Sequence, residues 1–222
     1  MIINEVASLI RSAVDEVATD ELICAYPEVE KDSVYIKNEM WKCPGMRKIH
    51  LETGKAQGMD VLHCVWFPDP GYNLPIFGCD VVATKHEVTA AIVDISPVYG
   101  TDAIYEQIAP IANSYRFPHK RVLPLWSDEI FSPHCKFMRL KSPRENRDYC
   151  DVLMRYLMVY LDEIHNAELD TEWIHEMKRL DDQIYYCKQQ KKNTKTIAVL
   201  SKWFDPLWAK NYIDTILFDE PK

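Results

Sequence analysis

Hydrophobic and polar residues follow different periods in successive parts of the chain. Near the N-terminus, hydrophobic residues recur at helical spacing from Val6 to Val17, which predicts an amphipathic helix lying across a sheet. Between residues 34 and 95, short β-prone runs alternate with turns rich in proline and glycine. We therefore predict five strands, over residues 34–42, 46–53, 60–67, 76–83 and 88–95.

The connections between these strands are too short to hold crossover helices, so the sheet is predicted to be antiparallel. Residues 97–133 are irregular and punctuated by proline, and we assign them no regular structure. One more strand is predicted over residues 134–140.

The C-terminal third is predicted to be helical. Two hydrophobic stripes with helical period indicate long helices over residues 152–164 and 173–187. Thr194 is expected to cap a shorter helix through residue 203, and Asp205 followed by Pro206 opens a last helix through residue 217. A helix, a sheet and further helices predict an α/β protein, a three-layer α/β/α sandwich with a central antiparallel sheet. We expect residues 1–222 to form a single domain.

Composition and charge narrow the environment and the partners. The net charge of -8 would repel a phosphate backbone, so we expect no nucleic-acid partner. The seven cysteines are scattered and never form a C-x-x-C pair, which favours a reducing compartment. The N-terminus does not resemble a signal peptide, and no apolar run is long enough to span a bilayer. We expect a soluble, cytoplasmic monomer.

Ionisable residues inside the most apolar strands are the unusual feature of this sequence. His63 lies in the run 60–67 and Asp80 in the run 76–83, where an unpaired charge would be costly to bury. The period of two along a strand places His50 and Glu52 on the same face. Three neighbouring strands are thus expected to present acids and imidazoles to one pocket.

The spacing alone does not decide between catalysis and structure. A core histidine with a hydrogen-bond partner and an aspartate bound to a backbone donor would explain His63 and Asp80 equally well. Asp94 lies in a similar apolar run, and we interpret it as structural because no second titrating group pairs with it.

Several kinds of site are disfavoured by missing motifs. The sequence has no H-E-x-x-H, C-x-x-C, G-x-G-x-x-G, P-loop or G-x-S-x-G motif, and its six glycines leave little for a phosphate-binding loop. We expect neither a nucleotide cofactor nor a metal. The basic run 188–195 is most simply a solvated helix end, with an anion site as the alternative.

Six segments of the chain carry a likeness to a known family. They are residues 47–52, 60–65, 74–82, 90–97, 186–195 and 208–219. In these segments the chain resembles the ferredoxin-dependent bilin reductases. The likeness covers nearly the whole sequence in order and is weakest between about residues 98 and 120. Such collinear matches are far more specific than one short motif.

The resemblance implies an α/β/α sandwich that holds biliverdin IXα between the sheet and the C-terminal helices. It implies no flavin or metal in the protein and reduced [2Fe-2S] ferredoxin as the external donor of single electrons. Each electron makes the tetrapyrrole more basic, so the protein must supply protons. By resemblance, Asp80 cycles a proton at the pyrrole nitrogens, His63 shares a proton with it, and Glu52 serves reduction of the D-ring vinyl group.

The same resemblance assigns residues that bind the substrate. Arg139 and Lys195 match residues that hold one propionate, with Asn193 beside them at the rim of the pocket. Thr89 stands where the family uses serine for the other propionate, and His50 completes the expected substrate-binding set.

Two features near the expected pocket concern the charge of the loop at Thr194 and the docking of the electron donor. Thr194 stands where familiar relatives have an acid, so the charge of this loop differs. The basic run 188–195 suits docking of the acidic ferredoxin.

Glu52 bears on the product. A phage-type branch of the family makes phycoerythrobilin through 15,16-dihydrobiliverdin and has aspartate at this place, so Glu52 favours phycocyanobilin. The alternatives are therefore reduction to phycoerythrobilin, a non-catalytic bilin carrier, or an ordinary structural or protein-binding domain. The expected source is a cyanobacterium or a phage-infected host cell.

Overall fold

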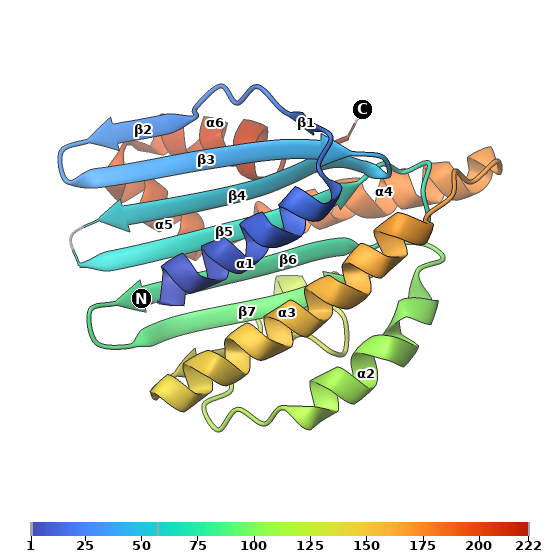
Figure 1. Cartoon of the computed structure of the whole chain (residues 1–222). Helices are drawn as coiled ribbons and strands as arrows, with labels where there is room; N and C mark the ends of the chain where they lie inside the picture. Colours follow the sequence, from blue (N-terminus) through green and yellow to red (C-terminus); the bar gives the residue numbers. More distant parts are fainter. Residues whose placement is uncertain (1, 57, 222) are drawn as a thin grey trace.

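A central antiparallel sheet organises the molecule (Figure 1). The computed structural model describes residues 2–56 and 58–221. The sheet has eight strands in the order β1-β3-β4-β5-β6-β7-β8, and β2 pairs with β3. The predicted antiparallel sheet is confirmed. The strands are β1 (Asp20–Glu21), β2 (Glu28–Lys31), β3 (Val34–Cys43), β4 (Met46–Ala56), β5 (Met59–Pro68), β6 (Ile76–Thr84), β7 (Val88–Ser96) and β8 (Lys136–Leu140).

The five long strands lie where the hydrophobic pattern predicts them, with ends that differ by a few residues at most. Strand β8 begins at Lys136, two residues later than predicted. Strands β1 and β2 were not predicted because they are short and mostly exposed, so they carry no alternating hydrophobic signal. The tight turn from β3 to β4 uses Gly45 with φ of +82°, a left-handed conformation that glycine adopts without strain.

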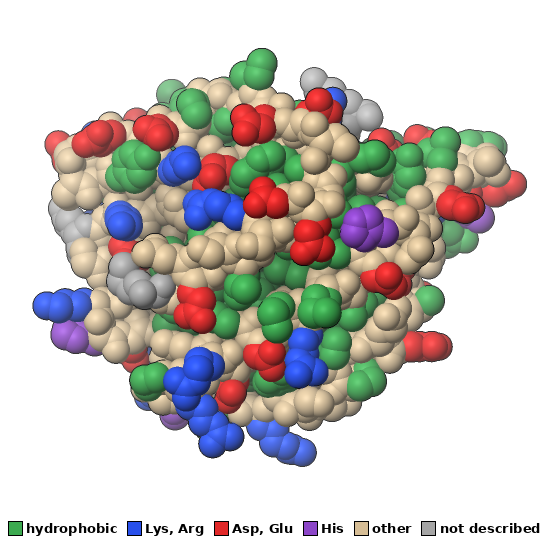
Figure 2. All heavy atoms as spheres, viewed as in Figure 1, with side chains coloured by type: hydrophobic (Ala, Val, Ile, Leu, Met, Phe, Trp, Pro, Cys, Tyr) green, Lys and Arg blue, Asp and Glu red, His purple; other side chains and the backbone are tan. Residues whose placement is uncertain are grey.

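Three helices cover one face of the sheet, in front of it in Figure 1. They are α1 (Ile2–Val17), α2 (Tyr105–Ser114) and α3 (Pro143–Asn166). Their buried residues pack with those of the sheet in one hydrophobic core, which includes Ile10, Trp66 and Tyr160. On the outer surface of this layer, acidic and basic side chains are interspersed with hydrophobic ones (Figure 2).

Two predictions for this layer were wrong. Helix α2 lies within residues 97–133, which were expected to be irregular, because Pro110 inside the helix disguised its pattern. Helix α3 starts nine residues before the predicted 152. Its N-terminus is set by Ser142 and Glu145, which form a capping box, and by Pro143 in the first turn.

The C-terminal helices cover the other face of the sheet (Figure 1). They are α4 (Trp173–Gln190), α5 (Thr194–Trp203), α6 (Pro206–Tyr212) and the π-helical turn η3 (Ile213–Leu217). A second hydrophobic core lies under them. The predicted three-layer α/β/α sandwich is confirmed.

The caps of this layer match the prediction at one helix and differ at another. Asp205 caps α6 as predicted, since its Oδ1 accepts hydrogen bonds from the backbone N–H groups of Leu207 and Trp208. Thr194 is not the cap of α5. Asn193 is, because its Oδ1 accepts from the backbone N–H groups of Lys195 and Thr196.

Residues 2–56 and 58–221 contain neither a membrane-spanning helix nor a cluster of metal ligands. None of the helices described there combines the length and the apolar character needed to cross a bilayer. No group of three or more His, Cys, Asp or Glu side chains there has the arrangement of a metal site.

Candidate active site

A row of side chains crosses the sheet on the face covered by α4, α5 and α6. Glu52 of β4 is directly opposite His63 of β5, and His63 is directly opposite Asp80 of β6. Residues opposed in this way point to the same face, with Cβ atoms about 4.5–5.5 Å apart. The row continues to Asn38 on one side and to Ile92 and Phe137 on the other. The sheet register thus brings Glu52, His63 and Asp80 together.

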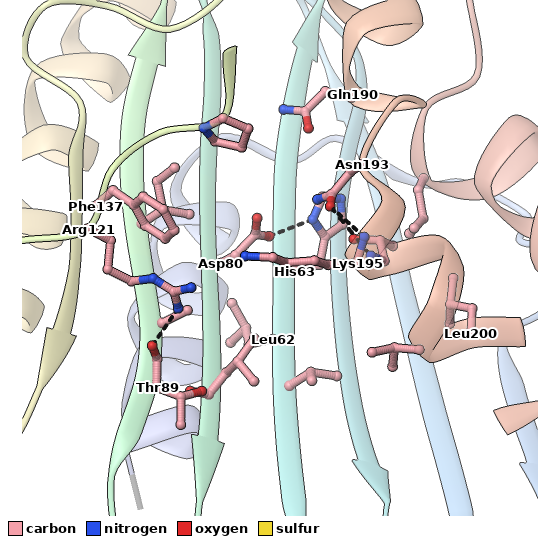
Figure 3. A pocket seen from close by; sticks show the side chains of 18 of the residues that line it. Leu62, His63, Asp80, Thr89, Arg121, Phe137, Gln190, Asn193, Lys195 and Leu200 are labelled. Atoms are coloured by element: carbon pink, nitrogen blue, oxygen red, sulfur yellow. Dashed lines mark hydrogen bonds and ion pairs between the residues drawn. The ribbon is translucent and has the colours of Figure 1, made fainter. Parts of the chain in front are cut away.

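A cavity of about 400 Å³ lies between this row and the C-terminal helices (Figure 3). This volume falls within the range of about 300–1,000 Å³ found for small-molecule sites. Much of its wall is apolar, with the side chains of Glu52, His63 and Asp80 on the strand side. The apolar lining includes Val61, Val82, Ile92, Leu123, Trp126, Phe131, Phe137, Leu200, Trp203 and Phe218.

His63 and Asp80 form a hydrogen-bonded ion pair. The distance from His63 Nδ1 to Asp80 Oδ1 is 2.6 Å, and the pair is drawn as a dashed line in Figure 3. Burial acts to lower the pKa of His63, but the Asp80 carboxylate and, more weakly, Glu52 outweigh it and raise that pKa. His63 Nε2 is buried and has no hydrogen-bond partner within residues 2–56 and 58–221. The pairing with Asp80 therefore favours the charged imidazole, and its Nε2 lies unpartnered in the cavity wall.

Glu52 is a buried carboxyl at the edge of the cavity. Its side chain is 5% exposed, and its Oε2 is 2.6 Å from the hydroxyl of Tyr212. Burial and the neighbouring Asp80 raise the pKa of Glu52, against the opposing effects of His63 and Tyr212. A carboxyl with a raised pKa carries a proton that it can donate.

His50 lies two residues before Glu52 on β4, on the same face of the sheet. It is fully buried and is not among the residues that line the cavity. Its Nε2 is 2.8 Å from Oδ1 of Asn38, and its ring contacts that of His63 edge to face with centroids 5.8 Å apart. Burial, Lys48 and His63 together hold the pKa of His50 well below its usual range. His50 is therefore a neutral imidazole beside the row formed by Glu52, His63 and Asp80.

Cationic side chains lie at the cavity, together with two of the predicted polar residues. Thr89, Asn193 and Lys195 all line it, as Figure 3 shows. Arg121 also lines the cavity and donates from Nη1 to the backbone carbonyl of Thr89 at 2.6 Å. Arg139 is exposed and is not among the lining residues.

Sequence reasoning missed Arg121. It lies in the irregular segment, where no periodicity indicates which side chains face inward. Burial and the nearby Arg139 lower the pKa of Arg121, which shows that the two guanidinium groups lie close enough to repel. Neither a motif nor its neighbours Val122 and Leu123 mark Arg121 in the sequence as a residue of the cavity.

Charged residues of β4 bind the C-terminal segment next to the site through ion pairs and hydrogen bonds. Lys48 binds Asp219 and the backbone carbonyl of Ile216, while Arg47 donates to the Asp219 carboxylate at 2.9 Å. This clamp holds Phe218 against the ring of His63, with centroids 5.4 Å apart. The π-helical turn before it places Leu217 in the cavity lining.

Asp94 lies apart from this row, in a hydrogen-bond network of its own. It accepts from the hydroxyl of Ser96 at 2.6 Å and from the backbone N–H of Ser132 at 3.0 Å. This arrangement fits the structural role predicted for Asp94, because its carboxylate binds Ser132, the residue next to Phe131 of the cavity wall.

Comparison with known proteins agrees with this architecture. Residues 6–219 match the family model of the ferredoxin-dependent bilin reductases. The phycocyanobilin:ferredoxin oxidoreductase of Synechococcus sp. (strain CC9902) is 41% identical over 206 residues, which cover 91% of this chain and 83% of that protein. That of Prochlorococcus marinus (strain MIT 9313) is 40% identical over 198 residues, covering 87% and 74%.

A solved structure has a similar fold. Tomato phytochromobilin synthase, crystallised in complex with biliverdin, superposes with a TM-score of 0.86 at 18% identity, over 98% of this chain and 82% of that one. The match extends through all three layers, in agreement with the observed sandwich. Since the family model spans the chain almost from end to end, this protein belongs to the ferredoxin-dependent bilin reductase family.

Proposed function

We propose that this protein reduces biliverdin IXα to phycocyanobilin, using single electrons from reduced [2Fe-2S] ferredoxin and protons from Asp80, His63 and Glu52. The observation that carries the proposal is the register of these three residues, which meet side by side in the wall of one cavity. The curated relatives named above for phycocyanobilin support the same product.

The cavity suits a large, flat, mostly apolar ligand with two acidic arms. Aromatic and aliphatic side chains form much of its wall, which would bury the conjugated rings. We propose that Lys195 and Arg139 hold one propionate with Asn193 at the rim, and that Thr89 and Arg121 hold the other. Arg121 is positioned for this because its guanidinium is already fixed on the Thr89 backbone.

The proton chemistry follows from the charges of the three groups. An electron added to the tetrapyrrole raises its basicity, so a nearby acid then gives up a proton more readily. The cation of His63 shares its proton with Asp80 across 2.6 Å, and the two act as a coupled pair. Glu52, whose pKa is raised by burial, supplies a further proton on the other side of His63.

Electrons reach the bilin from outside the protein in this proposal. The basic run 188–195 borders the cavity through Asn193 and Lys195, and its positive charge suits the acidic ferredoxin. Lys191 of this run is engaged within the chain, with Asp214 and Glu220, and Lys195 is assigned to the propionate, so Lys188 and Lys192 are the cations proposed for docking. The enzyme would act as a cytoplasmic monomer with no bound cofactor.

The test is an anaerobic assay with biliverdin, ferredoxin and a ferredoxin-reducing system, followed by chromatographic identification of the bilin. We expect phycocyanobilin. Phycoerythrobilin would assign the protein to the other branch of the family chemistry. Binding of biliverdin with no reduction would instead support a bilin carrier, and no binding at all would refute the proposal.

The substitution Glu52→Gln tests the assignment of the vinyl reduction. The amide keeps the size of the side chain and cannot donate a proton as an acid. We expect the A-ring to be reduced while the D-ring vinyl group persists in the chromatographed product. Reduction of the vinyl group at the wild-type rate would refute the role of Glu52.

A further inference from the structure

A line of buried polar groups runs from Glu52 away from the cavity. Oε2 of Glu52 is 2.6 Å from the hydroxyl oxygen of Tyr212, which is 2.8 Å from Oδ1 of Asn38. The same Oδ1 is 2.8 Å from Nε2 of His50. All four side chains are buried, between 0% and 5% exposed, and neither Asn38, His50 nor Tyr212 lines the cavity.

The orientation of the Asn38 amide is fixed. Its Nδ2 donates to the backbone carbonyl of Tyr26 at 2.8 Å, so Oδ1 is the atom that faces Tyr212 and His50. An amide oxygen carries no hydrogen, and His50 must therefore bear its proton on Nε2. This agrees with a neutral His50, whose pKa lies well below its usual range.

The contacts along this line determine which groups carry a hydrogen. Three oxygens stand in sequence, on Glu52, Tyr212 and Asn38, and each of the two contacts between them needs one hydrogen. Tyr212 supplies one of these hydrogens. Asn38 Oδ1 has none to give, so only a protonated Glu52 can supply the other. In that state Glu52 donates to Tyr212, and Tyr212 donates to Asn38.

We infer that Tyr212, oriented by Asn38 and His50, is a positioning residue: it accepts the hydrogen of neutral Glu52, and it donates to the Glu52 carboxylate once the bilin takes that proton. The inference rests on the proposed function for the identity of the acceptor. When the O–H bond of Glu52 breaks, the proton forms a bond to the bilin already reduced by ferredoxin, and the electron pair stays on the carboxylate. Tyr212 then turns its single hydrogen from Asn38 to the new Glu52 carboxylate.

Asn38 is not left without a donor in this exchange, because His50 keeps its Nε2–H on the same oxygen. With Glu52 ionised, the contact between Tyr212 and Asn38 has no hydrogen, so the observed distances fit the neutral acid. The charged and titratable groups around Glu52 are His63, Asp80, Tyr212 and, through His50, Lys48. Among them Asp80 favours the neutral acid, and His63 and Tyr212 favour the carboxylate.

The fold holds the Tyr212 ring rigidly. The ring stacks on Trp208 with centroids 4.6 Å apart and meets Tyr26 edge to face at 6.0 Å. Tyr26 offers a matched control, since its hydroxyl binds Asn211 at 3.1 Å and lies outside the line from Glu52 to His50. Tyr26→Phe therefore removes a neighbouring hydroxyl without touching the inferred network.

Infrared spectroscopy of the bilin-free protein tests the protonation of Glu52 without relying on turnover. At neutral pH we expect a carboxylic-acid C=O band that disappears in Glu52→Gln. The band should shift in Tyr212→Phe, which removes the acceptor of the acid proton, and stay in place in Tyr26→Phe. A Glu52 that is ionised at neutral pH would overturn the inference, whether or not the protein reduces biliverdin.

Turnover provides the second test. In Tyr212→Phe the Glu52 carboxylate loses its donor, so the pKa of Glu52 should rise and the reduction that depends on it should slow by about 10- to 100-fold. Biliverdin affinity should stay at the wild-type value, because Tyr212 does not line the cavity. A Tyr212→Phe rate and pH profile equal to those of Tyr26→Phe would also overturn the inference. A wild-type protein that does not reduce biliverdin would refute the proposed function and leave the inferred protonation of Glu52 standing.

Discussion

Asp80 is the residue on which the proposed proton chemistry depends most directly. We expect Asp80→Asn to bind biliverdin as the wild type does and to lose turnover by about 10²- to 10⁴-fold, because the amide keeps the shape without an ionisable proton. Spectroscopic titration and anaerobic turnover measure the two effects separately. Asp60→Asn is the matched control, since Asp60 does not line the cavity. Full activity in Asp80→Asn would contradict the mechanism.

Asp94 should affect stability through pH. Burial outweighs the hydrogen bonds from Ser132 and Ser96 and raises its pKa from 3.8 to about 6. Since the folded protein binds this proton more tightly than the unfolded chain, the stabilisation is complete below the unfolded pKa and is lost as the pH rises through 6.

The comparison of wild type with Asp94→Asn isolates this effect. The difference in unfolding free energy, wild type minus variant, should fall by about 2–2.5 kcal/mol between about pH 4 and pH 7. Urea denaturation across this range measures it. Parallel pH curves for the two proteins would show that Asp94 titrates normally.

Among the elements, α3 depends on a local signal at its start. The Ser142 hydroxyl accepts from the backbone N–H of Glu145 at 3.2 Å, and the Glu145 carboxylate accepts from the N–H of Ser142 at 3.1 Å. We expect Ser142→Ala to lower the unfolding free energy by about 1 kcal/mol. Ser12→Ala, at an exposed position inside α1, should stay within about 0.5 kcal/mol of wild type in the same denaturation experiment. Equal values for both would argue against the capping box.

Elements were predictable where one face is buried against the sheet. The strands carrying His63 and Asp80 are short, β-prone apolar runs between turns, and the stripe from Val152 to Ile164 repeats with the period of a helix. Helix α2 escaped prediction because Pro110 is tolerated there by tertiary packing, with Ile108 and Ala112 buried against the core. Strand β2 escaped because its exposed residues depend on β3 for their hydrogen bonds.

At the scale of the whole molecule, the clamp between β4 and the C-terminus joins residues 171 positions apart. Lys48 is 7% exposed, and burial lowers its pKa against the attraction of Asp219. We expect Asp219→Asn to cost about 2–3 kcal/mol, because it leaves a buried cation without its partner. Combining it with Lys48→Met should cost less than the sum of the single changes.

A double-mutant cycle measures the coupling, which should be about 1–2 kcal/mol. The exposed pair of Lys42 and Asp20, 3.9 Å apart, is the control and should couple by no more than about 0.5 kcal/mol. Additive effects at Lys48 and Asp219 would show that the clamp does not stabilise the fold.

The sequence by itself determined the five long strands of the sheet, the long helices and the anomaly of ionisable residues in apolar strands. These are local properties, because the period of hydrophobic positions reports which face of an element is buried. The resemblance to the bilin reductases suggested a chemical role for Glu52, His63 and Asp80. The match of residues 6–219 to the family model confirms the membership of the family.

Only the tertiary structure decided how these residues meet. Sheet register sets Glu52 opposite His63 and His63 opposite Asp80, and register depends on turns and packing far from the residues themselves. Arg121 comes from an irregular segment, 32 residues beyond its partner Thr89. Tyr212 comes from a late helix, 160 residues beyond its partner Glu52. Because such contacts form between distant parts of the chain, no local pattern encodes them.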